Sequence, residues 1–187
     1  MSGVSTLPAS LQKRLHAELK PGEIVVWAGQ PIPSHFMRSG FGLWLFFIPW
    51  TAFSVFWMAG ASGFTLPDFS HGWSFFPLFG LPFLLIGLGG LGTPYFLWRK
   101  AKHIVYATTS LRALILQGEK TFSVQSFWPA DLTRLERKEH PDGSGSLFFA
   151  KEAEEPGGSK SKLRGFMAIA KVRQAEQALE RLRLQNQ

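Results

Sequence analysis

Two long apolar runs without a charged side chain dominate the hydrophobic pattern of this chain. Neither residues 39–67 nor residues 72–98 contain Lys, Arg, Asp or Glu. A helix rises about 1.5 Å per residue, so about 20 residues cross a hydrocarbon core of about 30 Å, and each run is long enough. The pattern therefore predicts a transmembrane hairpin over residues 39–98, with helices at about 41–61 and 75–98.

Proline residues modify the second predicted helix. Pro77, Pro82 and Pro94 remove backbone donors, so we expect this helix to be shortened or kinked, which membrane helices tolerate better than soluble ones. The alternative is a pair of core helices in a soluble protein. The absence of charge favours the membrane, because one central Arg or Lys would cancel most of the insertion free energy of the first run, about 3 to 5 kcal/mol.

The charges around the two runs predict the orientation of the hairpin. The connecting loop, residues 62–74, contains no Lys or Arg, whereas basic residues precede the first run and follow the second. These basic residues are Lys20, Arg38, Arg99, Lys100 and Lys102. The positive-inside rule therefore predicts a multi-pass protein with both termini in the cytoplasm.

Two shorter elements are predicted within residues 1–38. Leucines recur every four residues in residues 5–20, which predicts an amphipathic helix that ends at Pro21-Gly22. This helix packs on a cytoplasmic domain or, as the alternative, lies on the membrane surface. Residues 23–28 read as a strand. Because a lone strand is not stable, we expect it to pair with a sheet formed after residue 100.

Residues 99–187 carry the pattern of a small antiparallel sheet in a cytoplasmic domain. Short segments rich in β-branched, aromatic or Leu residues are separated by turns. The predicted strands are residues 102–108, 111–117, 121–127, 132–138, 146–151 and 162–168. From residue 170 the apolar period becomes that of an amphipathic helix. The predicted fold class is an α+β membrane protein: a two-helix hairpin plus a bent antiparallel sheet or open barrel, capped by a C-terminal helix.

A set of motifs resembles the bacterial pleckstrin-homology-like domains. Residues 106–116 contain Tyr106, Thr109 and Arg112 in a Tyr-x-x-Thr-x-x-Arg-x-Leu-Ile pattern, residues 165–169 precede the last helix, and residues 19–31 are similar to openings of membrane-bound members. Ser110 stands where an Asn is common, and residues 152–155 form an acidic insertion. The resemblance implies a PH-like binding module in a bacterial cytoplasmic (inner) membrane, without catalytic residues to carry over.

No motif in the chain indicates catalysis, a cofactor or a metal. Cysteine is absent, the five histidines lack metal-ligand spacing, and no nucleophile elbow or phosphate loop occurs. Residues 87–92 match the dinucleotide pattern G-x-G-x-x-G but lie in a predicted span, where small residues favour helix packing. We therefore expect a non-enzymatic protein.

The net charge of +7 is concentrated on the predicted cytoplasmic side. Anionic lipid is the nearer partner there, so we expect no binding of nucleic acid. The candidate membrane-interface or headgroup contacts are Arg38, Arg99, Lys100, Lys102, Lys160, Lys162, Arg164, Lys171 and Arg173. The leading hypothesis is a scaffolding module that binds a protein partner at the membrane surface, and the alternative is a sensor of anionic lipid headgroups.

Overall fold

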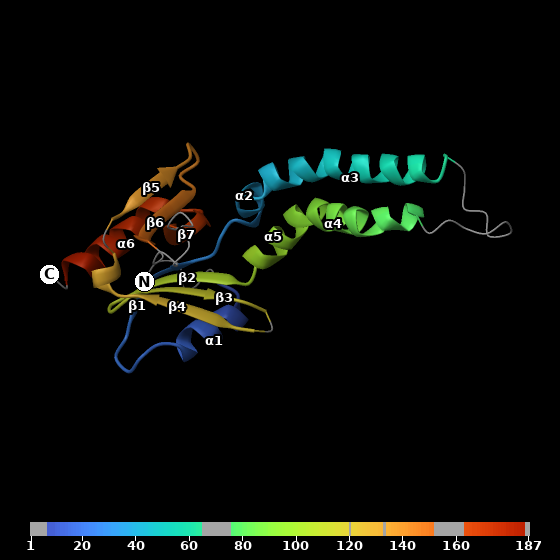
Figure 1. The fold of residues 1–187 in the computed structure, drawn as a ribbon. Helices are drawn as coiled ribbons and strands as arrows, with labels where there is room; N and C mark the ends of the chain where they lie inside the picture. The colour runs from blue at the N-terminus through green and yellow to red at the C-terminus, as the bar shows by residue number, and fades with distance from the viewer. Residues whose placement is uncertain (1–6, 65–75, 120, 133, 152–162, 186–187) are drawn as a thin grey trace. The chain divides into compact units, whose positions relative to one another are not determined.

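The computed structural model describes residues 7–64, 76–119, 121–132, 134–151 and 163–185 (Figure 1). The chain divides into two compact units. Residues Met1–Phe36 and Arg99–Gln187 form the first unit, and residues Met37–Trp98 form the second, which we call the hairpin unit. The described residues form six α-helices and two antiparallel sheets, so the α+β class is confirmed.

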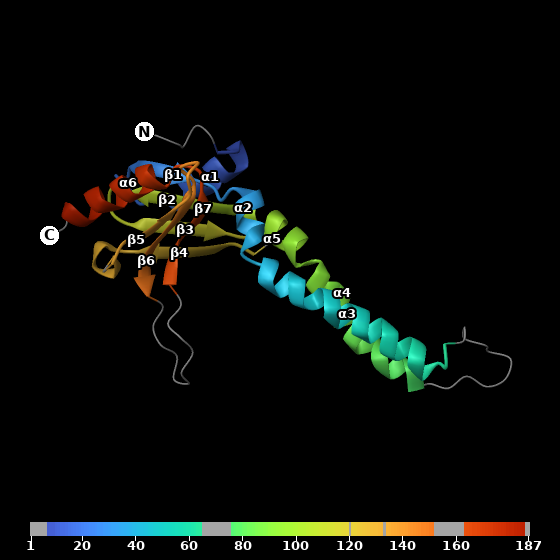
Figure 2. The ribbon, with the colours of Figure 1, turned by 90° about the horizontal axis from the view of Figure 1, so that it is seen from above.

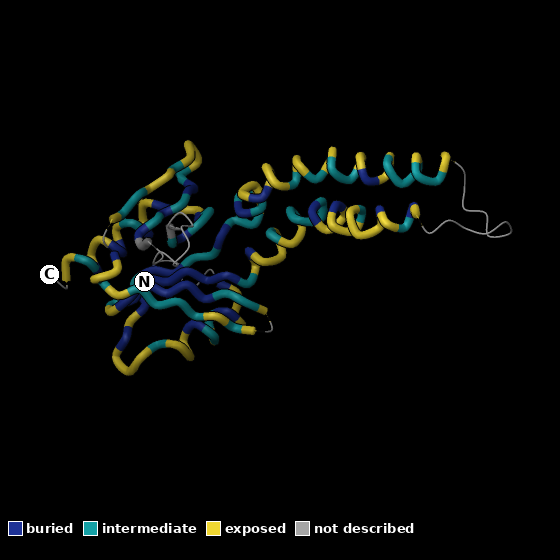
Figure 3. Tube along the Cα trace, viewed as in Figure 1, coloured by how far each residue is buried: buried dark blue, intermediate teal, exposed yellow. Residues whose placement is uncertain are grey.

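The hairpin unit begins with one long, straight apolar element. Helix α3 covers Phe41–Ala61, which matches the first predicted span, and it is long and apolar enough to cross a membrane. Only 6% of its apolar window is buried, and Phe53 and Phe56 are each 65% exposed. The exposed positions along α3 are visible in Figure 3.

The second predicted helix, residues 75–98, is kinked, as its prolines led us to expect. The chain forms a short 3₁₀ helix, Phe76–Gly80, then α4, Leu81–Leu91, and then α5, Thr93–Ala101. The two parts are bent by 41° at Gly92. By length and composition, α3 could cross a membrane as one continuous helix, whereas the second crossing requires the bent pair to act as one span. Pro94 lies in the first turn of α5, where its ring and missing N–H prevent α4 from continuing.

Glycine residues set the packing between α3 and the returning chain. A side-chain carbon at Gly80 would collide with Met58, one at Gly87 with Thr51, and one at Gly90 with Phe47. The helices therefore approach closely through three positions without side chains, which is the packing favoured where the surroundings are apolar. Gly87 is the first glycine of the G-x-G-x-x-G pattern and Gly90 lies within it, so close helix packing accounts for these two glycines.

The first unit contains a four-stranded antiparallel sheet of order β1-β2-β3-β4 (Figure 1). Its strands are β1 Val25–Gly29, β2 Ile104–Thr109, β3 Ala113–Gln117 and β4 Ser123–Phe127. Strand β1 pairs with β2 from Val25 opposite Thr109 to Gly29 opposite Tyr106. The prediction that the strand before the hairpin pairs with the sheet after it is confirmed, and the hairpin is inserted between two neighbouring strands.

The second sheet has three strands of order β5-β6-β7 (Figure 2). They are β5 Glu136–Glu139, β6 Gly145–Lys151 and β7 Leu163–Ile169, and helix α6, Val172–Leu184, follows. Strand β5 begins four residues later than predicted, because Pro129–Asp131 form a 3₁₀ turn and Leu132 is buried after it. An isolated bridge between Pro31 and Ile169 joins the second sheet to the continuation of β1.

Apolar side chains cover both faces of the first sheet. Helix α1, Ala9–Ala17, packs Leu11 and Leu15 against Val105, Leu114 and other residues of one face. The membrane-surface alternative for this helix is therefore wrong, because its apolar stripe is already buried. The other face carries a ring cluster in which Phe166 lies 5.0 Å from both Tyr106 and Phe149. Helix α6 adds Val172, Ala175, Leu179 and Leu182, all buried.

We expect the first unit to fold without the hairpin. Replacing residues 37–98 with a Gly/Ser linker of about twelve residues, spanning about 20 Å, leaves both sheets and both core faces intact. The product should be water-soluble and unfold cooperatively on heating, as followed by circular dichroism. The same chain without residues 1–36 loses β1 and α1 and should be unfolded. Equal stability of the two chains would contradict the pairing argument.

Candidate functional site

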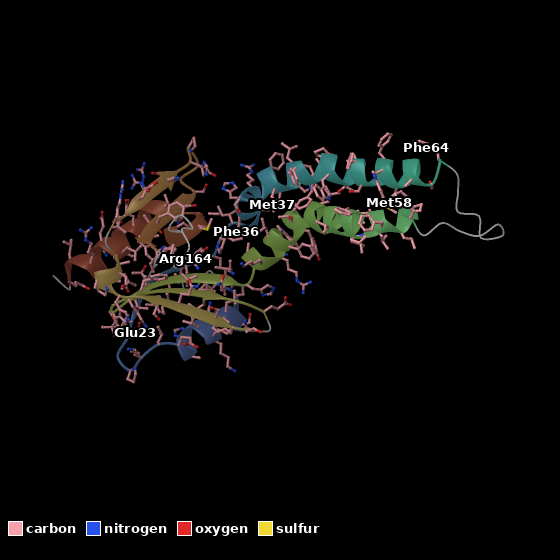
Figure 4. The ribbon with its side chains drawn as sticks, in the orientation of Figure 1. Glu23, Phe36, Met37, Met58, Phe64 and Arg164 are labelled. Atoms are coloured by element: carbon pink, nitrogen blue, oxygen red, sulfur yellow. The ribbon has the colours of Figure 1, made fainter. Side chains whose placement is uncertain are left out.

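A buried ion pair closes the end of the first sheet where β1 begins. Glu23, labelled in Figure 4, accepts from Arg112 in a two-pronged arrangement. Arg112 Nε lies 3.0 Å from Oε1 and Arg112 Nη2 lies 3.1 Å from Oε2. The Glu23 side chain is fully buried, and the Thr109 hydroxyl donates to its Oε1 at 2.7 Å. The pair therefore joins residues that lie on opposite sides of the hairpin in the sequence.

Every remaining polar group around this pair has a partner. The backbone N–H of Lys20 donates to Glu23 Oε2 at 2.8 Å, and Arg112 also donates to the Ser126 hydroxyl and to the Glu18 carbonyl. Burial alone would raise the pKa of Glu23, but these hydrogen bonds and the charge of Arg112 outweigh it and hold that pKa below its usual value. A fully satisfied pair of this kind has no lone pair left for a ligand.

The residues that carry the family resemblance are thus used inside the fold. Thr109 and Arg112 hold Glu23, and Tyr106 packs on Phe166, where burial raises the tyrosine pKa to about 12. Sequence reasoning missed the role of Glu23. The available signal was one acidic residue at the start of an apolar strand, but its partner lies 89 positions away.

The predicted basic contacts divide by their place in the fold. Most described members lie at the ends of elements: Arg38 ends α2 (Pro33–Arg38), Arg99 and Lys100 lie in the last turn of α5, Lys102 follows it, Lys171 precedes α6, and Arg173 lies in its first turn. Lys160 and Lys162 lie outside the described residues. Arg164, labelled in Figure 4, lies near the beginning of β7 and is half-buried.

Several of these residues lie toward one end of the first unit, and we call this group the basic rim. Its members are Arg99, Lys100, Lys102, Lys171 and Arg173. The Gln30 side chain donates to the Lys102 carbonyl, the Ile32 N–H to the Ala168 carbonyl, and the Val172 N–H to the Gly143 carbonyl. These contacts bring Lys102 and the start of α6 to the segment that leads into the hairpin. Arg164 lies five residues before the end of β7, about 17 Å along the strand at about 3.3 Å per residue.

Carboxylates neutralise part of the predicted basic set. Glu119, in the β3–β4 turn, lies 3.1 Å from Arg99 Nη2 and 3.7 Å from His103 Nε2. Glu139 accepts from Arg173 Nε at 2.8 Å. Arg137 forms ion pairs with Glu139 and Glu176, which extends the charge network from β5 to α6. The rim therefore offers a diffuse positive charge rather than a preformed pocket for one headgroup.

Two of the five histidines are neighbours in the fold, although no spacing in the sequence connects them. The rings of His35 and His140 lie 5.8 Å apart. His35 Nδ1 lies 3.1 Å from the Ser144 hydroxyl, which donates to Asp142 Oδ1 at 2.6 Å. The hydrogen bonds from the Ser144 hydroxyl and N–H are the main cause that lowers the pKa of Asp142.

This serine–histidine–aspartate group is a structural contact between the β5–β6 turn and α2. In a nucleophilic triad the carboxylate orients the histidine, whereas here Asp142 accepts from Ser144 itself. Ser144 is 2% exposed, so a substrate has no access to its hydroxyl. Within the described residues, no group of three or more His, Asp or Glu side chains is placed to hold a metal ion.

The hairpin unit contains an apolar pocket of about 320 Å³. It is lined by Trp50, Phe53, Ser54, Trp57, Phe79, Gly80 and Phe83. The Ser54 hydroxyl donates to the Trp50 carbonyl, and the Trp50 indole N–H to the Phe83 carbonyl. The Ser54 hydroxyl and the Trp50 indole are thus paired within the hairpin, and the surface of the pocket is mostly apolar.

Comparisons of the chain with protein-family models, with curated proteins and with solved structures found no match. The functional argument therefore rests on the residues and geometry described above.

We expect the Glu23–Arg112 pair to be required for stability. Glu23→Gln leaves Arg112 buried without its counter-charge, which should cost about 3 to 5 kcal/mol of unfolding free energy. Because folding lowers the pKa of Glu23, the stabilisation should be present above the unfolded pKa of about 4.5 and be lost as pH falls through the lower folded value. Urea unfolding at pH 7 and pH 3 measures both effects.

The matched control for this prediction is the double variant Glu23→Gln with Arg112→Met, which removes both charges. It should recover part of the lost stability, because no unpaired charge remains. Equal stability of Glu23→Gln and the parent chain at pH 7 would refute the role assigned to the pair.

Proposed function

We propose that the chain is an integral protein of the bacterial cytoplasmic membrane, whose hairpin holds a PH-like module at the membrane surface for binding a protein partner. The observation that carries this proposal is the insertion of the hairpin between paired strands β1 and β2. Any membrane that accepts the hairpin must hold the sheet next to it, because the chain leaves and re-enters the same sheet.

Exposure of the hairpin supports the membrane part of the proposal. Helix α3 has 21 residues and a length of about 32 Å, close to the hydrocarbon thickness. A core helix of a soluble protein is mostly buried, whereas α3 is 6% buried over its apolar window. The second crossing would be the bent pair α4 and α5, which ends in Arg99 and Lys100, residue types that favour the cytoplasmic interface.

The order of elements supports the PH-like part. Two antiparallel sheets followed by a C-terminal helix are compatible with the bent antiparallel sheet and capping helix that we expected. The Pro31–Ile169 bridge brings β1 and β7 together, as closure of a bent sheet toward a barrel requires. Helix α6 buries five side chains against this body, as a capping helix would.

The state of the basic residues favours a protein partner over a specific lipid. Arg99 and Arg173 already contact carboxylates, and Arg112, the arginine of the sequence motif, forms the buried ion pair with Glu23. The rim can still add attraction to an anionic leaflet of about 1 kcal/mol for each free cation. Lipid then orients the module, and selectivity belongs to a protein-binding surface.

The first prediction from this proposal concerns topology, which single cysteines can test because the native chain has none. Gln185→Cys should react with a membrane-impermeant maleimide only after the cells are opened. Ser70→Cys, in the connecting loop outside the described residues, should react in intact cells. Labelling of Gln185→Cys from outside, or extraction of the protein by alkaline carbonate, would contradict the membrane proposal.

The second prediction separates a protein partner from a lipid sensor. The full chain purified in mild detergent should retain a stoichiometric protein after cross-linking in intact cells. In nanodiscs carrying only anionic lipid, charge-removing Gln variants of Lys100, Lys102 and Lys171 should change binding to soluble anionic headgroup probes by less than about twofold. Tight, headgroup-selective binding that these variants abolish would favour the lipid sensor instead.

A further inference from the structure

We propose that strand β4 is the docking edge of the module, and that an extended segment of the partner, with an acidic residue near each end, adds beside it as a fifth strand. This inference rests on the proposed function, because it names the surface and the chemistry of the protein partner. Strand addition to a sheet edge derives its affinity from main-chain hydrogen bonds and its selectivity from the flanking side chains.

Strand β4 has the properties of an unprotected edge. It stands at the end of the described sheet order and pairs with β3 in a regular register from Ala113 opposite Phe127 to Gln117 opposite Ser123. Its sequence, Ser-Val-Gln-Ser-Phe, contains no charge, proline or glycine. Edge strands of soluble domains are normally protected by charge, proline or a bulge, so a regular neutral edge is a surface suited to pairing.

Two other sheet edges of the first unit, those of β1 and β5, are protected. Strand β1 has a register shift between Val25 and Trp27, and its continuation is joined to β7 through Pro31 and Ile169. Strand β5 reads Glu-Arg-Lys-Glu, so every residue carries a charge. These features direct an incoming strand to β4.

The hydrogen-bonding phase of the sheet identifies the free groups of β4. The Thr109 N–H donates to the Arg112 carbonyl and the Gly118 N–H to the His103 carbonyl. Arg112 and Gly118 therefore direct their backbone groups to β2. Because the direction of the backbone groups alternates from residue to residue along an antiparallel strand, those of Ala113, Ile115 and Gln117 are directed to β4. Their opposite residues are Phe127, Gln125 and Ser123.

Val124 and Ser126 therefore direct their backbone N–H and C=O groups away from β3, toward the outer edge. The next residue of this phase, Trp128, confirms it, because its N–H donates to Asp131 Oδ2 at 2.8 Å. Two donors and two acceptors thus remain for an added strand between the ends of β4.

A cation lies beside each end of this edge. The Arg14 guanidinium lies 5.2 Å from the Phe122 ring centroid, and the Lys20 ammonium lies 4.6 Å from that of Trp128. Arg14 donates to the backbone carbonyls of Gly118 and Glu119, which are neutral and leave its positive charge in place. Lys20 has no ion pair among the described residues. Phe122 and Trp128 are six residues apart, or about 20 Å, which sets the spacing of the carboxylates in the partner.

The test uses synthetic fluorescent peptides of about seven residues, enough to cover the edge at about 3.3 Å per residue. The sequence Glu-Thr-Val-Thr-Val-Thr-Glu is compared with the same peptide carrying Lys in place of Glu. Binding to the full chain in nanodiscs is followed by fluorescence anisotropy, and amide hydrogen exchange reports the site. The acidic peptide should bind at least tenfold more tightly, with slower exchange at Val124 and Ser126.

Matched variants distinguish edge pairing from general attraction. Val124→Pro removes an outward N–H but no β3–β4 hydrogen bond, and it should weaken binding at least tenfold, whereas Val124→Thr keeps the N–H and should bind within twofold of the parent. Lys20→Glu should weaken the acidic peptide about tenfold, and Lys13→Glu, an exposed charge on the preceding helix α1, by less than twofold. Lys20→Glu changes an exposed side chain, so it gives a result even where Val124→Pro fails to fold.

Four outcomes would overturn the inference. They are equal binding by Val124→Pro and Val124→Thr, protection at β5 in place of β4, no binding of either peptide, and self-association of the chain that Val124→Pro abolishes, which would make the occupant a second copy. The proposed function is judged separately: a stoichiometric partner that Val124→Pro retains would leave that function standing while excluding this edge.

Discussion

The buried pair of Glu23 and Arg112 is the interaction on which the arrangement of this protein depends. It joins Glu23, two residues before β1, to Arg112, the residue before β3, although the whole hairpin unit lies between them in the sequence. Closing so long an intervening segment costs chain entropy, and the cost grows as about (3/2)RT ln n. A charged pair that is costly to bury unless fully satisfied also specifies one register of β1 against β2, since a slip would leave both charges unpaired.

The described residues of the Tyr-x-x-Thr-x-x-Arg motif are all used in packing or in the buried ion pair. Tyr106 contributes to the aromatic cluster, Thr109 and Arg112 satisfy Glu23, and the described polar groups at Ser144 bind one another. The functions that remain belong to surfaces: the apolar outside of the hairpin, the basic rim and the edge of β4.

Local pattern made most elements predictable, and distance along the chain limited the rest. Alternation and turn chemistry placed β2, β3, β4 and β6 within two residues of their observed bounds, because strand signals and turns are local. The break at Gly92 was expected only as a kink, since three prolines in the run could each have caused it.

The missed parts of the candidate site depend on residues far apart in the sequence. Ser144 lies 109 positions from His35, and Arg112 lies 89 from Glu23, so no spacing rule could pair them. The burial of the apolar stripe of α1 likewise required the sheet face that receives it. The charge pattern indicated where basic residues gather, but their neutralisation by Glu119 and Glu139 depends on turns folding back.

The geometry of the first sheet allows the rim and the β4 edge to act together. Gln117 pairs with Ile104 on one side and with Ser123 on the other, so β4 begins at the end of the sheet where the chain returns from the hairpin. Phe127 lies opposite Ala113, next to Arg112, at the far end. A strand added along β4 would therefore lie between the end of the sheet that follows the hairpin unit and the Glu23–Arg112 end, about 13 Å away at about 3.3 Å per residue. The lipid attraction and the partner pairing that we propose would use different groups, and neither would need to displace the other.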